Sequence, residues 1–485
     1  MTRAMAPPDP LPITPIPPAR WRRIDVSVTP PGSKSLTNRA VLLAALARGA
    51  SRVRRPLLGA DDSERMLEAV RALGARATIL ADGDLEIEGV DGRWPVGPDG
   101  VRLDLGNAGT ATRFLAAAAL VADGPVTIDG DARMRERPIG DLASALESLG
   151  ARVEWLGTPG CPPLRIVPAD HNAVAPASSG VSFGETMSSQ FISAMLLVAP
   201  WLPSGLTVTL PDGATSASYV RMTLGLLDRL GAGVQVSGDL RVIRVAPGPG
   251  RIADLSHGRP RGLGAFDYTV EPDASGATYF WTAAAILPGA RVKVNGQGDA
   301  GLQGDAMFPH VLGRMGATVQ VSTGHPSAIT DREGEFGPAS ITVRGGDRLR
   351  PVLADMGDMP DAVMSLGVAC ALARGHSVVR GVRTLRVKES DRIAAMRAEL
   401  AKVGVDVREH PGDPDTITIT PPEGGIDCRP DAPRVEFETY RDHRMAMSLS
   451  LIGLRRPNVL IRDPGCVGKT YPGFWDDLAL LSTAD

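Results

Sequence analysis

The sequence predicts an α/β (α+β) protein with two domains, built from six repeated units of about 80 residues, three units to a domain. Two repeating signals support this prediction. A tag in which a helix ends at a glycine and a strand follows occurs five times, and an apolar helix with a polar start occurs six times. Because both signals advance in step, they account for nearly all of the 485 residues.

The tag is an aliphatic residue followed by glycine and then by strand-forming residues, as in Leu149-Gly150-Ala151-Arg152-Val153. Glycine readily takes the left-handed conformation that closes a helix, and β-branched residues favour the strand behind it. The tag glycines are Gly74, Gly150, Gly231, Gly316 and Gly404. Each unit is therefore expected to contain an amphipathic helix that ends at its tag.

The six apolar helices are predicted to begin near Lys34, Asn107, Ser188, Asp273, Asp361 and His443. Segments such as 114–122 and 362–373 carry no charged residue, and a helix that is apolar on all sides has to be buried. One unit has too few apolar residues to cover such a helix, so three units should share a core. The segment 247–264, between the third and fourth units, is interpreted as the crossover between domains or an insertion beside it.

Composition argues against several classes of protein. With 52 Lys and Arg against 55 Asp and Glu, and 4% aromatic residues, the chain lacks the excess of cations and the stacking side chains that nucleic acids require. No apolar run approaches the roughly 18 to 20 residues that span a bilayer. The first 20 residues contain seven prolines, so they are expected to form a flexible tail and not a secretory signal.

The cysteines are far apart, form no CxxC pair and have no histidine at metal-ligand spacing. They are Cys161, Cys370, Cys428 and Cys466. This pattern predicts no metal site and a reducing compartment, the cytoplasm. A glycine pattern at Gly296–Gly301 matches a dinucleotide fingerprint, but no clean acidic residue for a ribose follows it, so no nucleotide cofactor is expected.

Several helix starts combine cations with hydroxyl groups, which suits anion binding at a helix N-terminus. In the stretch Pro31–Arg39, Ser35 and Arg39 lie one turn apart and Lys34 precedes them. Together they would suit a phosphate beside a carboxylate. A solvated basic helix start remains the alternative.

More cations follow along the chain, namely Arg113, Arg133, Arg135, Arg137, Lys388, Arg392, Arg444 and Lys469. For Arg133 and Arg135, a solvated surface position is the alternative. Arg444 enters an apolar helix and needs an anionic partner, which a substrate with several negative charges would supply.

Candidates for acid–base chemistry are few. Asp361 lies at a helix start, and Glu389 lies between two cations. Nearby cations lower the pKa of a carboxyl group, whereas burial raises it. Helix capping for Asp361 and a surface ion pair for Glu389 remain the alternatives.

Six motifs, in order, resemble those of the EPSP synthases (3-phosphoshikimate 1-carboxyvinyltransferases), a family of enolpyruvyl transferases. They are Pro31–Ser35 with Asn38-Arg39, Leu105–Thr110 with Arg113, Arg133-Met134 with Glu136–Gly140, Ser188–Phe191, Arg386–Glu389 with Asp391-Arg392, and Asp442–Met447. The resemblance extends from about Ile24 to Leu481.

The resemblance implies two domains of three βαβαββ units each, with an active site in the cleft between them. It places residues 21–31 and 272–485 in one domain and residues 32–271 in the other, behind the tail 1–20. The implied reaction transfers the enolpyruvyl group of phosphoenolpyruvate to the 5-hydroxyl of shikimate 3-phosphate by addition and elimination of phosphate, on the way to chorismate and the aromatic amino acids. No metal or organic cofactor is implied, and members are usually monomeric.

The resemblance also implies roles for individual residues. The shikimate 3-phosphate set is Lys34, Ser35, Arg39, Ser188, Ser189, Gln190, Ser216, Asp361 and Lys388. The phosphoenolpyruvate set is Lys34, Gly109, Arg137, Gln190, Arg392, Arg444 and Lys469. Asp361 resembles the base for the 5-hydroxyl, Glu389 the acid that protonates the methylene carbon, and Lys34 a group that touches both substrates and shares in the proton transfers.

The chain departs from the family pattern at three positions. Phe114 stands where the family often has proline, and Thr384 stands where many members have an asparagine that contacts a ring hydroxyl. The segment after Ser216 lacks the usual Lys/Arg-Pro pair. Gly109, the small residue that leaves room for glyphosate in sensitive members, is present, so we expect glyphosate to inhibit the protein.

Two alternatives stay open. The related transferase that acts on UDP-N-acetylglucosamine shares the repeats, and Cys161 superficially fits its loop thiol. Ser35 after Lys34, and the stretch Asp442-His443-Arg444, favour the shikimate enzyme. The second alternative is an inactive anion-binding scaffold, which would have no need of an acid–base pair.

Overall fold

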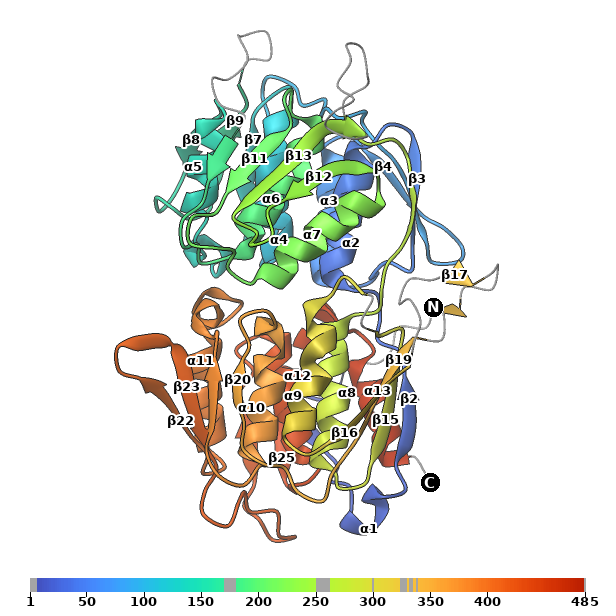
Figure 1. Cartoon of the computed structure of the whole chain (residues 1–485), viewed down its shortest axis with the longest axis vertical. Helices are drawn as coiled ribbons and strands as arrows, with labels where there is room; N and C mark the ends of the chain where they lie inside the picture. Colours follow the sequence, from blue (N-terminus) through green and yellow to red (C-terminus); the bar gives the residue numbers. More distant parts are fainter. Residues whose placement is uncertain are drawn as a thin grey trace. The chain divides into compact units, whose positions relative to one another are not determined.

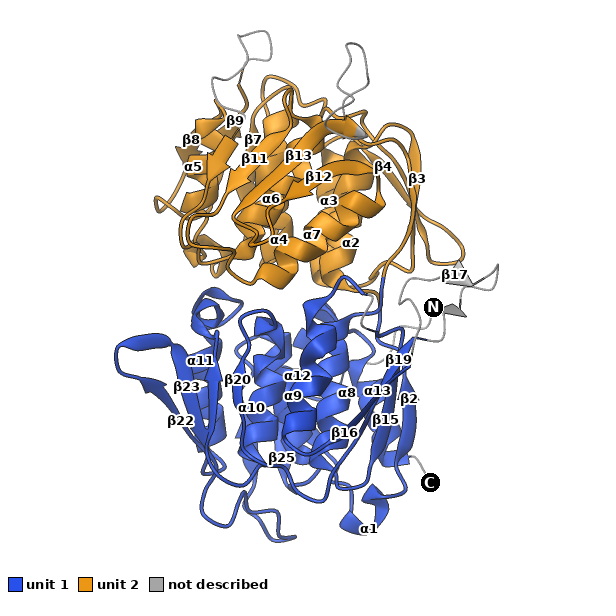
Figure 2. Cartoon of the chain, in the orientation of Figure 1, with its two compact units in different colours: residues 1–31, 271–485 blue, residues 32–270 orange. Residues whose placement is uncertain are grey.

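The chain forms two compact units (Figure 1, Figure 2). The computed structural model describes residues 7–169, 180–249, 262–298, 301–322, 329–330, 335–336 and 339–483. Unit 1 comprises Met1–Pro31 and Glu271–Asp485, and unit 2 comprises Gly32–Val270. Unit 1 therefore contains both termini, and the chain leaves it once, after Pro31, and returns at Glu271.

Five four-stranded sheets share one strand order, and a sixth sheet has three strands, a pattern that confirms the predicted repeats. In a full repeat, a strand, an apolar helix and a parallel strand are followed by an amphipathic helix and an antiparallel hairpin. The strands lie in the order first, second, fourth, third. The repeating unit is therefore βαβαββ, and each compact unit contains three of its sheets.

Unit 2 contains the following elements. The first sheet comprises β14 (Asp267–Thr269), β3 (Ala50–Arg54), β5 (Leu85–Glu88) and β4 (Arg76–Ile79), with α2 (Lys34–Leu46) and α3 (Asp61–Ala72). The second comprises β6 (Val101–Asp104), β7 (Val126–Asp129), β9 (Leu164–Val167) and β8 (Arg152–Trp155), with α4 (Gly109–Ala118), η1 (Ala119–Val121), η2 (Met134–Glu136) and α5 (Gly140–Ser148). The third comprises β10 (Gly180–Ser182), β11 (Leu206–Thr209), β13 (Val242–Pro249) and β12 (Ala232–Val236), with α6 (Ser189–Val198), η3 (Ala199–Trp201) and α7 (Ala217–Arg229).

Unit 1 is built in the same way. One sheet comprises β2 (Asp25–Val28), β15 (Arg291–Asn295), β19 (Ser340–Arg344) and β16 (Thr318–Ser322), with α8 (Ala274–Ile286), η5 (Gly304–Met307), α9 (Phe308–Arg314) and the ribbon β17 (Ile329–Thr330) and β18 (Glu335–Phe336). The next comprises β20 (Leu353–Asp355), β21 (Ser377–Arg380), β23 (Asp413–Thr420) and β22 (Asp406–His410), with η6 (Pro360–Ala362), α10 (Val363–Ala371), η7 (Arg383–Val387) and α11 (Arg392–Ala401). The last comprises β24 (Val435–Phe437), β25 (Val459–Ile461) and β1 (Leu11–Ile13), with α1 (Pro18–Trp21), α12 (His443–Gly453), η8 (Pro464–Lys469) and α13 (Phe474–Thr483).

Two edge strands are exchanged where the chain crosses between units. β2 precedes α2 in the chain but pairs in parallel with β15 of unit 1. β14 precedes α8 but pairs in parallel with β3 of unit 2. Each unit therefore completes one repeat with a strand from a distant part of the sequence.

The apolar helices form the centre of each unit. Every residue of α8 is buried, and α8, α10 and α12 pack against one another in unit 1 (Figure 1). In unit 2, α4 packs against α2 and α6. Each of these helices belongs to a different repeat, so the packing confirms the predicted shared cores. One repeat alone could not cover a helix that is apolar on all sides.

The predicted helix ends are also confirmed. All five tag glycines have φ between 81° and 109°, in the left-handed region that glycine enters without a steric cost. Amphipathic helices α3, α5, α7, α9 and α11 each end just before one of them.

The expectation of a flexible tail over residues 1–20 is wrong for the part that the structure describes. β1 pairs antiparallel with β25 and supplies the third strand of the last sheet. Ile13 and Ile16 are buried, and Trp21 Nε1 donates to Ile16 O at 2.7 Å. Burial of the two isoleucines holds the segment, and an edge strand tolerates the proline at position 12. Parts of two segments from the sequence analysis lie outside the described residues. They are residues 250–261 of the segment 247–264 and residues 299–300 of the glycine pattern.

Candidate active site

Unit 1 contains a buried cluster of arginine and carboxylate side chains. Arg392, the first residue of α11, has a side chain that is 1% exposed. Its Nη1 donates to Asp361 Oδ1 (2.9 Å), its Nη2 to Glu389 Oε2 (2.8 Å) and its Nε to Asp442 Oδ2 (2.9 Å). The candidate base, Asp361, and the candidate acid, Glu389, thus accept hydrogen bonds from two nitrogens of the same guanidinium.

A second arginine completes this cluster. Arg444, at the second position of α12, donates from Nη2 to Asp361 Oδ2 at 2.8 Å. Lys388 Nζ lies 4.0 Å from Asp361 Oδ1. The anionic partner that the sequence demands for Arg444 is therefore Asp361, a residue of the protein itself. Three cations face three carboxylates, and such pairing is what makes buried charge tolerable.

Arg392 remains a cation in this environment. Burial lowers the pKa of Arg392, but the charges of Asp442, Glu389 and Asp361 outweigh burial and raise the pKa above its ordinary value. The arginine is consequently a permanent positive centre between the two candidate catalytic carboxylates.

Asp442 fixes both arginines, a role that the sequence did not reveal. Its Oδ1 accepts from the backbone N–H of Arg444 at 3.0 Å and so caps α12. Its Oδ2 accepts from Arg392 and also from Ser390 Oγ at 2.9 Å. An aspartate directly before a polar helix start is an N-cap signal, which could have identified this residue.

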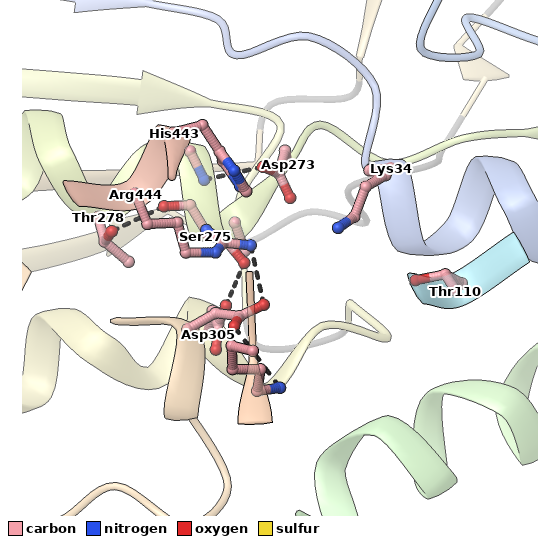
Figure 3. A network of polar contacts seen from close by, with 12 residues as sticks. Lys34, Thr110, Asp273, Ser275, Thr278, Asp305, His443 and Arg444 are labelled. Atoms are coloured by element: carbon pink, nitrogen blue, oxygen red, sulfur yellow. Dashed lines mark hydrogen bonds and ion pairs between the residues drawn. The ribbon is translucent and has the colours of Figure 1, made fainter. Parts of the chain in front are cut away.

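A further carboxyl group, that of Asp305, lies close enough to Asp361 for the two charges to interact. Figure 3 shows Asp305 of η5 beside Ser275 of α8, whose hydroxyl donates to Asp305 Oδ2. Burial and the charge of Asp361 raise the pKa of Asp305 to about 7, although Ser275 and Arg444 act in the opposite direction. The sequence around Asp305 gave no signal of this environment.

Unit 2 holds Lys34 in an ion pair. Lys34 is the first residue of α2, and its Nζ lies 3.2 Å from Oδ2 of the buried Asp62 in α3. Sequence reasoning missed Asp62. A signal was available, because Asp62 lies on the buried stripe of α3 that continues through Met66 and Val70.

Arg39 has a packing role in unit 2. Its Nη1 donates to Ser35 O and its Nε to Thr223 Oγ1, both at 2.9 Å. Its guanidinium lies 5.0 Å from the centroid of the Phe114 ring. Burial lowers the pKa of Arg39 to about 10. Phe114, which departs from the family pattern, therefore supplies an aromatic face to this cation.

The start of α4 is built against Arg137. Arg137 Nη1 donates to Asn107 Oδ1 at 2.9 Å. A Cβ atom added at Gly109 would lie 2.5 Å from Arg137 Nη2, so the glycine leaves the space that the guanidinium fills. Arg113 Nη2 donates to Pro138 O at 2.8 Å and ties the loop of Arg137 to α4.

The start of α6 is capped as the sequence predicts for a polar helix start. Ser188 Oγ accepts from the backbone N–H of Gln190 at 3.3 Å, and Gln190 Nε2 donates to Thr110 Oγ1 at 3.4 Å. Ser189 is buried in the first turn. Ser216 precedes α7 with φ of 47°, a left-handed conformation.

The remaining predicted residues lie in unit 1. Thr384 in η7 is 5% exposed, and its Oγ1 has no hydrogen-bond partner among the residues that the structure describes. Lys469 is the last residue of η8, which packs against α12. Within the described ranges, no three His, Cys, Asp or Glu side chains are placed to hold a metal ion. The helices of those ranges are all too short or too polar to cross a membrane.

Known proteins resemble this chain over nearly its whole length. The model of the EPSP synthase (3-phosphoshikimate 1-carboxyvinyltransferase) family matches residues 19–478. The 3-phosphoshikimate 1-carboxyvinyltransferase of Laribacter hongkongensis is 43% identical over 456 residues, which are 94% of this chain and 96% of the relative. That of Erwinia tasmaniensis is 39% identical over 466 residues, 95% of this chain and 96% of the relative.

Solved structures agree with the sequence comparison. EPSP synthase from Acinetobacter baumannii has a TM-score of 0.72 at 27% identity, covering 98% of this chain and 97% of its own. The enolpyruvyl transferase NikO from Streptomyces tendae shares the fold, with a TM-score of 0.66 at 20% identity and 96% of both chains covered. The chain therefore belongs to the EPSP synthase (3-phosphoshikimate 1-carboxyvinyltransferase) family.

Proposed function

We propose that this protein transfers the enolpyruvyl group of phosphoenolpyruvate to the 5-hydroxyl of shikimate 3-phosphate and releases phosphate, the penultimate step towards chorismate. Membership of the family supplies the reaction. The assignment of roles depends on one observation. The buried guanidinium of Arg392 donates hydrogen bonds to both Asp361 and Glu389, through two different nitrogens. An acid and a base held on one cation suit a reaction with two proton transfers.

Asp361 is the proposed base. It takes the proton of the 5-hydroxyl as that oxygen bonds to C2 of phosphoenolpyruvate. Protonation removes the negative charge that Arg392 and Arg444 now neutralise. Both arginines then bind the phosphate and carboxylate of the substrate more strongly. Proton abstraction and anion binding are coupled in this way.

Glu389 is the proposed acid. It gives a proton to C3 of phosphoenolpyruvate during addition, which yields the tetrahedral intermediate. In the elimination step, C3 returns a proton to Glu389 as the bond from C2 to the phosphate oxygen breaks. Asp361 passes the proton of the former 5-hydroxyl to the departing phosphate, which restores both carboxyl groups. The hydrogen bond from Arg392 keeps the carboxyl group of Glu389 in place through both steps.

The substrate sets proposed from family motifs divide between the units. Unit 1 supplies Asp361, Lys388, Arg392, Arg444 and Lys469, and unit 2 supplies Lys34, Ser35, Arg39, Gly109, Arg137, Ser188, Ser189, Gln190 and Ser216. Asp62 orients the ammonium of Lys34, the residue proposed to contact both substrates. The mechanism requires no other partner, and we propose a cytoplasmic monomer.

Transfer to UDP-N-acetylglucosamine is not favoured. The matching family and the relatives above carry the shikimate name. Cys161, the thiol that superficially fits the sister family, is half-buried, and burial raises the pKa of this thiol. A thiol with a raised pKa is a weaker proton donor and nucleophile at neutral pH.

The test is phosphate release from the purified chain. Phosphoenolpyruvate is supplied with either shikimate 3-phosphate or UDP-N-acetylglucosamine. Asp361→Asn and Glu389→Gln remove the two proton-transfer groups, and Glu88→Gln, which breaks an exposed ion pair with Arg76, is the control. We expect release only with the shikimate substrate, lost in both variants and kept in the control. Release only with the nucleotide sugar, or with neither acceptor, would overturn the proposal.

A further inference from the structure

Glu399 is a buried carboxylate that the cluster around Arg392 does not include. It lies two turns after Arg392 on the same face of α11 and is 1% exposed. Its Oε1 accepts from the Tyr440 hydroxyl at 2.7 Å, and its Oε2 accepts from the backbone N–H of Glu438 at 2.8 Å. Both oxygens therefore bind the segment that leads into α12.

Lys402 adds to this connection. Its Nζ donates to Glu399 Oε2 at 2.6 Å and to the backbone carbonyl of Glu436 at 3.0 Å. The lysine balances the buried charge of Glu399 and also contacts the middle residue of β24. A buried carboxylate with a cation and two further donors is a costly arrangement unless every partner is in place.

The segment held by Glu399 contains an uncommon turn. Tyr440 and Arg441 both have φ of 55°, a left-handed conformation that residues with side chains seldom adopt. Two such residues in succession persist only where surrounding contacts hold them. The next residue, Asp442, donates its N–H to Thr439 O at 2.8 Å and begins the first turn of α12.

The turn at Tyr440 and Arg441 directly precedes two residues of the cluster around Arg392, namely Asp442 and Arg444. Asp442 reaches Arg392, and Arg444 reaches Asp361, directly after the left-handed pair. α11 thus contacts this part of the chain at two points, through Arg392 at its start and Glu399 two turns later. One point carries the candidate catalytic groups, and the other carries none of them.

We infer that Glu399 is a positioning residue, which fixes the turn at 440–441 and thereby sets the place of Asp442 and Arg444 beside Asp361. The inference rests on the proposed function, in which Arg444 binds phosphoenolpyruvate. Glu399 acts through the turn that precedes Arg444. Its loss should therefore weaken the binding of phosphoenolpyruvate more than the binding of shikimate 3-phosphate.

Steady-state kinetics test the inference with Tyr440→Phe, which removes one hydroxyl, and Glu399→Gln, which removes the charge. Arg397→Gln is the matched control, because Arg397 lies on the same helix and pairs with Glu409 at the surface. We expect the KM for phosphoenolpyruvate to rise on the order of tenfold in Glu399→Gln, with a smaller rise in Tyr440→Phe. The KM for shikimate 3-phosphate and the control should change little. An equal rise in both KM values, or none, would overturn the inference.

A rescue experiment separates positioning from general stability. Glycine adopts φ of 55° without strain, so Arg441→Gly in the Glu399→Gln background should recover part of the affinity for phosphoenolpyruvate. Arg441→Ala in the same background should not. Equal behaviour of the two double variants contradicts a role for the turn.

Hydrogen exchange over residues 438–444 supplies a readout that does not depend on turnover. Exchange should be faster in Glu399→Gln and Tyr440→Phe than in the wild type and in Arg397→Gln. Unchanged exchange would refute the positioning role, whereas a wild type without phosphate release would count against the proposed function.

Discussion

Arg444 donates a 2.8 Å hydrogen bond from Nη2 to Oδ2 of Asp361, so the start of one apolar helix neutralises a carboxylate at the start of another. Arg392 binds the other oxygen of the same carboxylate. In the proposed mechanism both arginines also bind the anionic substrate. Asp361 and phosphoenolpyruvate therefore compete for the same two cations until Asp361 accepts a proton.

This competition predicts opposite effects of Asp361→Asn on turnover and binding. The amide keeps the shape of the side chain but cannot accept the proton, so kcat should fall by about 10² to 10⁴. The arginines lose a charged competitor, so phosphoenolpyruvate should bind at least as tightly as to the wild type. Single-turnover phosphate release and calorimetric titration measure the two quantities. Weaker binding of phosphoenolpyruvate in the variant would show that Asp361 orients the arginines more than it competes for them.

Gly109→Ala is expected to disturb the phosphoenolpyruvate site through Arg137. The added Cβ would lie 2.5 Å from Arg137 Nη2, and the far end of a flexible side chain has to move. We expect the KM for phosphoenolpyruvate to rise several-fold with a smaller change in kcat. Glyphosate should inhibit the wild type and inhibit Gly109→Ala less.

Gly97→Ala is the control for that substitution, because no atom lies within 4 Å of the added Cβ at this position. Its kinetics should match the wild type. Turnover of the wild type that is unaffected by a large excess of glyphosate would contradict the prediction.

Thr384→Val tests whether a substrate hydroxyl uses the buried threonine. Within the described part of the chain, Thr384 Oγ1 has no hydrogen-bond partner, and a buried unsatisfied hydroxyl costs about 1 kcal/mol or more. Valine has nearly the same shape, so the free protein should be as stable or slightly more stable. The KM for shikimate 3-phosphate should rise by about fivefold, the equivalent of one neutral hydrogen bond. A lower stability with an unchanged KM would assign the hydroxyl to the protein instead of the substrate.

The repeats and helix ends could be predicted because they depend on local chemistry. Gly74 and Gly404 close their helices through a conformation that only glycine adopts easily, and that preference can be recognised from sequence alone. The exchanged strands could not be predicted. β2 has four residues, and Asp25 pairs with Arg291, 266 positions away, so no local pattern indicates its partner.

The same limit applies to the site. Motifs identified Asp361, Glu389 and Arg392, but their arrangement around one guanidinium depends on how three segments of unit 1 pack. Asp62 and Asp305 belong to no motif that the sequence analysis used. The importance of each carboxylate depends on a charged or hydroxyl partner, and only the folded chain brings the two partners together.

Asp305 predicts a dependence of stability on pH. Its pKa is about 7 in the folded chain, against an ordinary value of 3.8, because burial and the charges of Asp361 and Asp273 raise it more than the Ser275 hydrogen bond and the charge of Arg444 lower it. Between these two values the folded state holds a proton that the unfolded state releases. The contribution of Asp305 to the free energy of unfolding is therefore largest at low pH and is lost as the pH rises to 7. The loss is at most about 1.4 kcal/mol per pH unit.

Urea unfolding of the wild type and Asp305→Asn across this pH range isolates the contribution. The asparagine variant does not titrate at this position, so its stability relative to the wild type should increase with pH and become constant above the folded pKa. Ser275→Ala removes the hydrogen bond that opposes the shift, so it should move the same change to higher pH. A difference between wild type and Asp305→Asn that is constant from acid to neutral pH would mean that Asp305 ionises normally. In that case neither burial nor the charge of Asp361 raises the pKa of this carboxyl group in the folded chain.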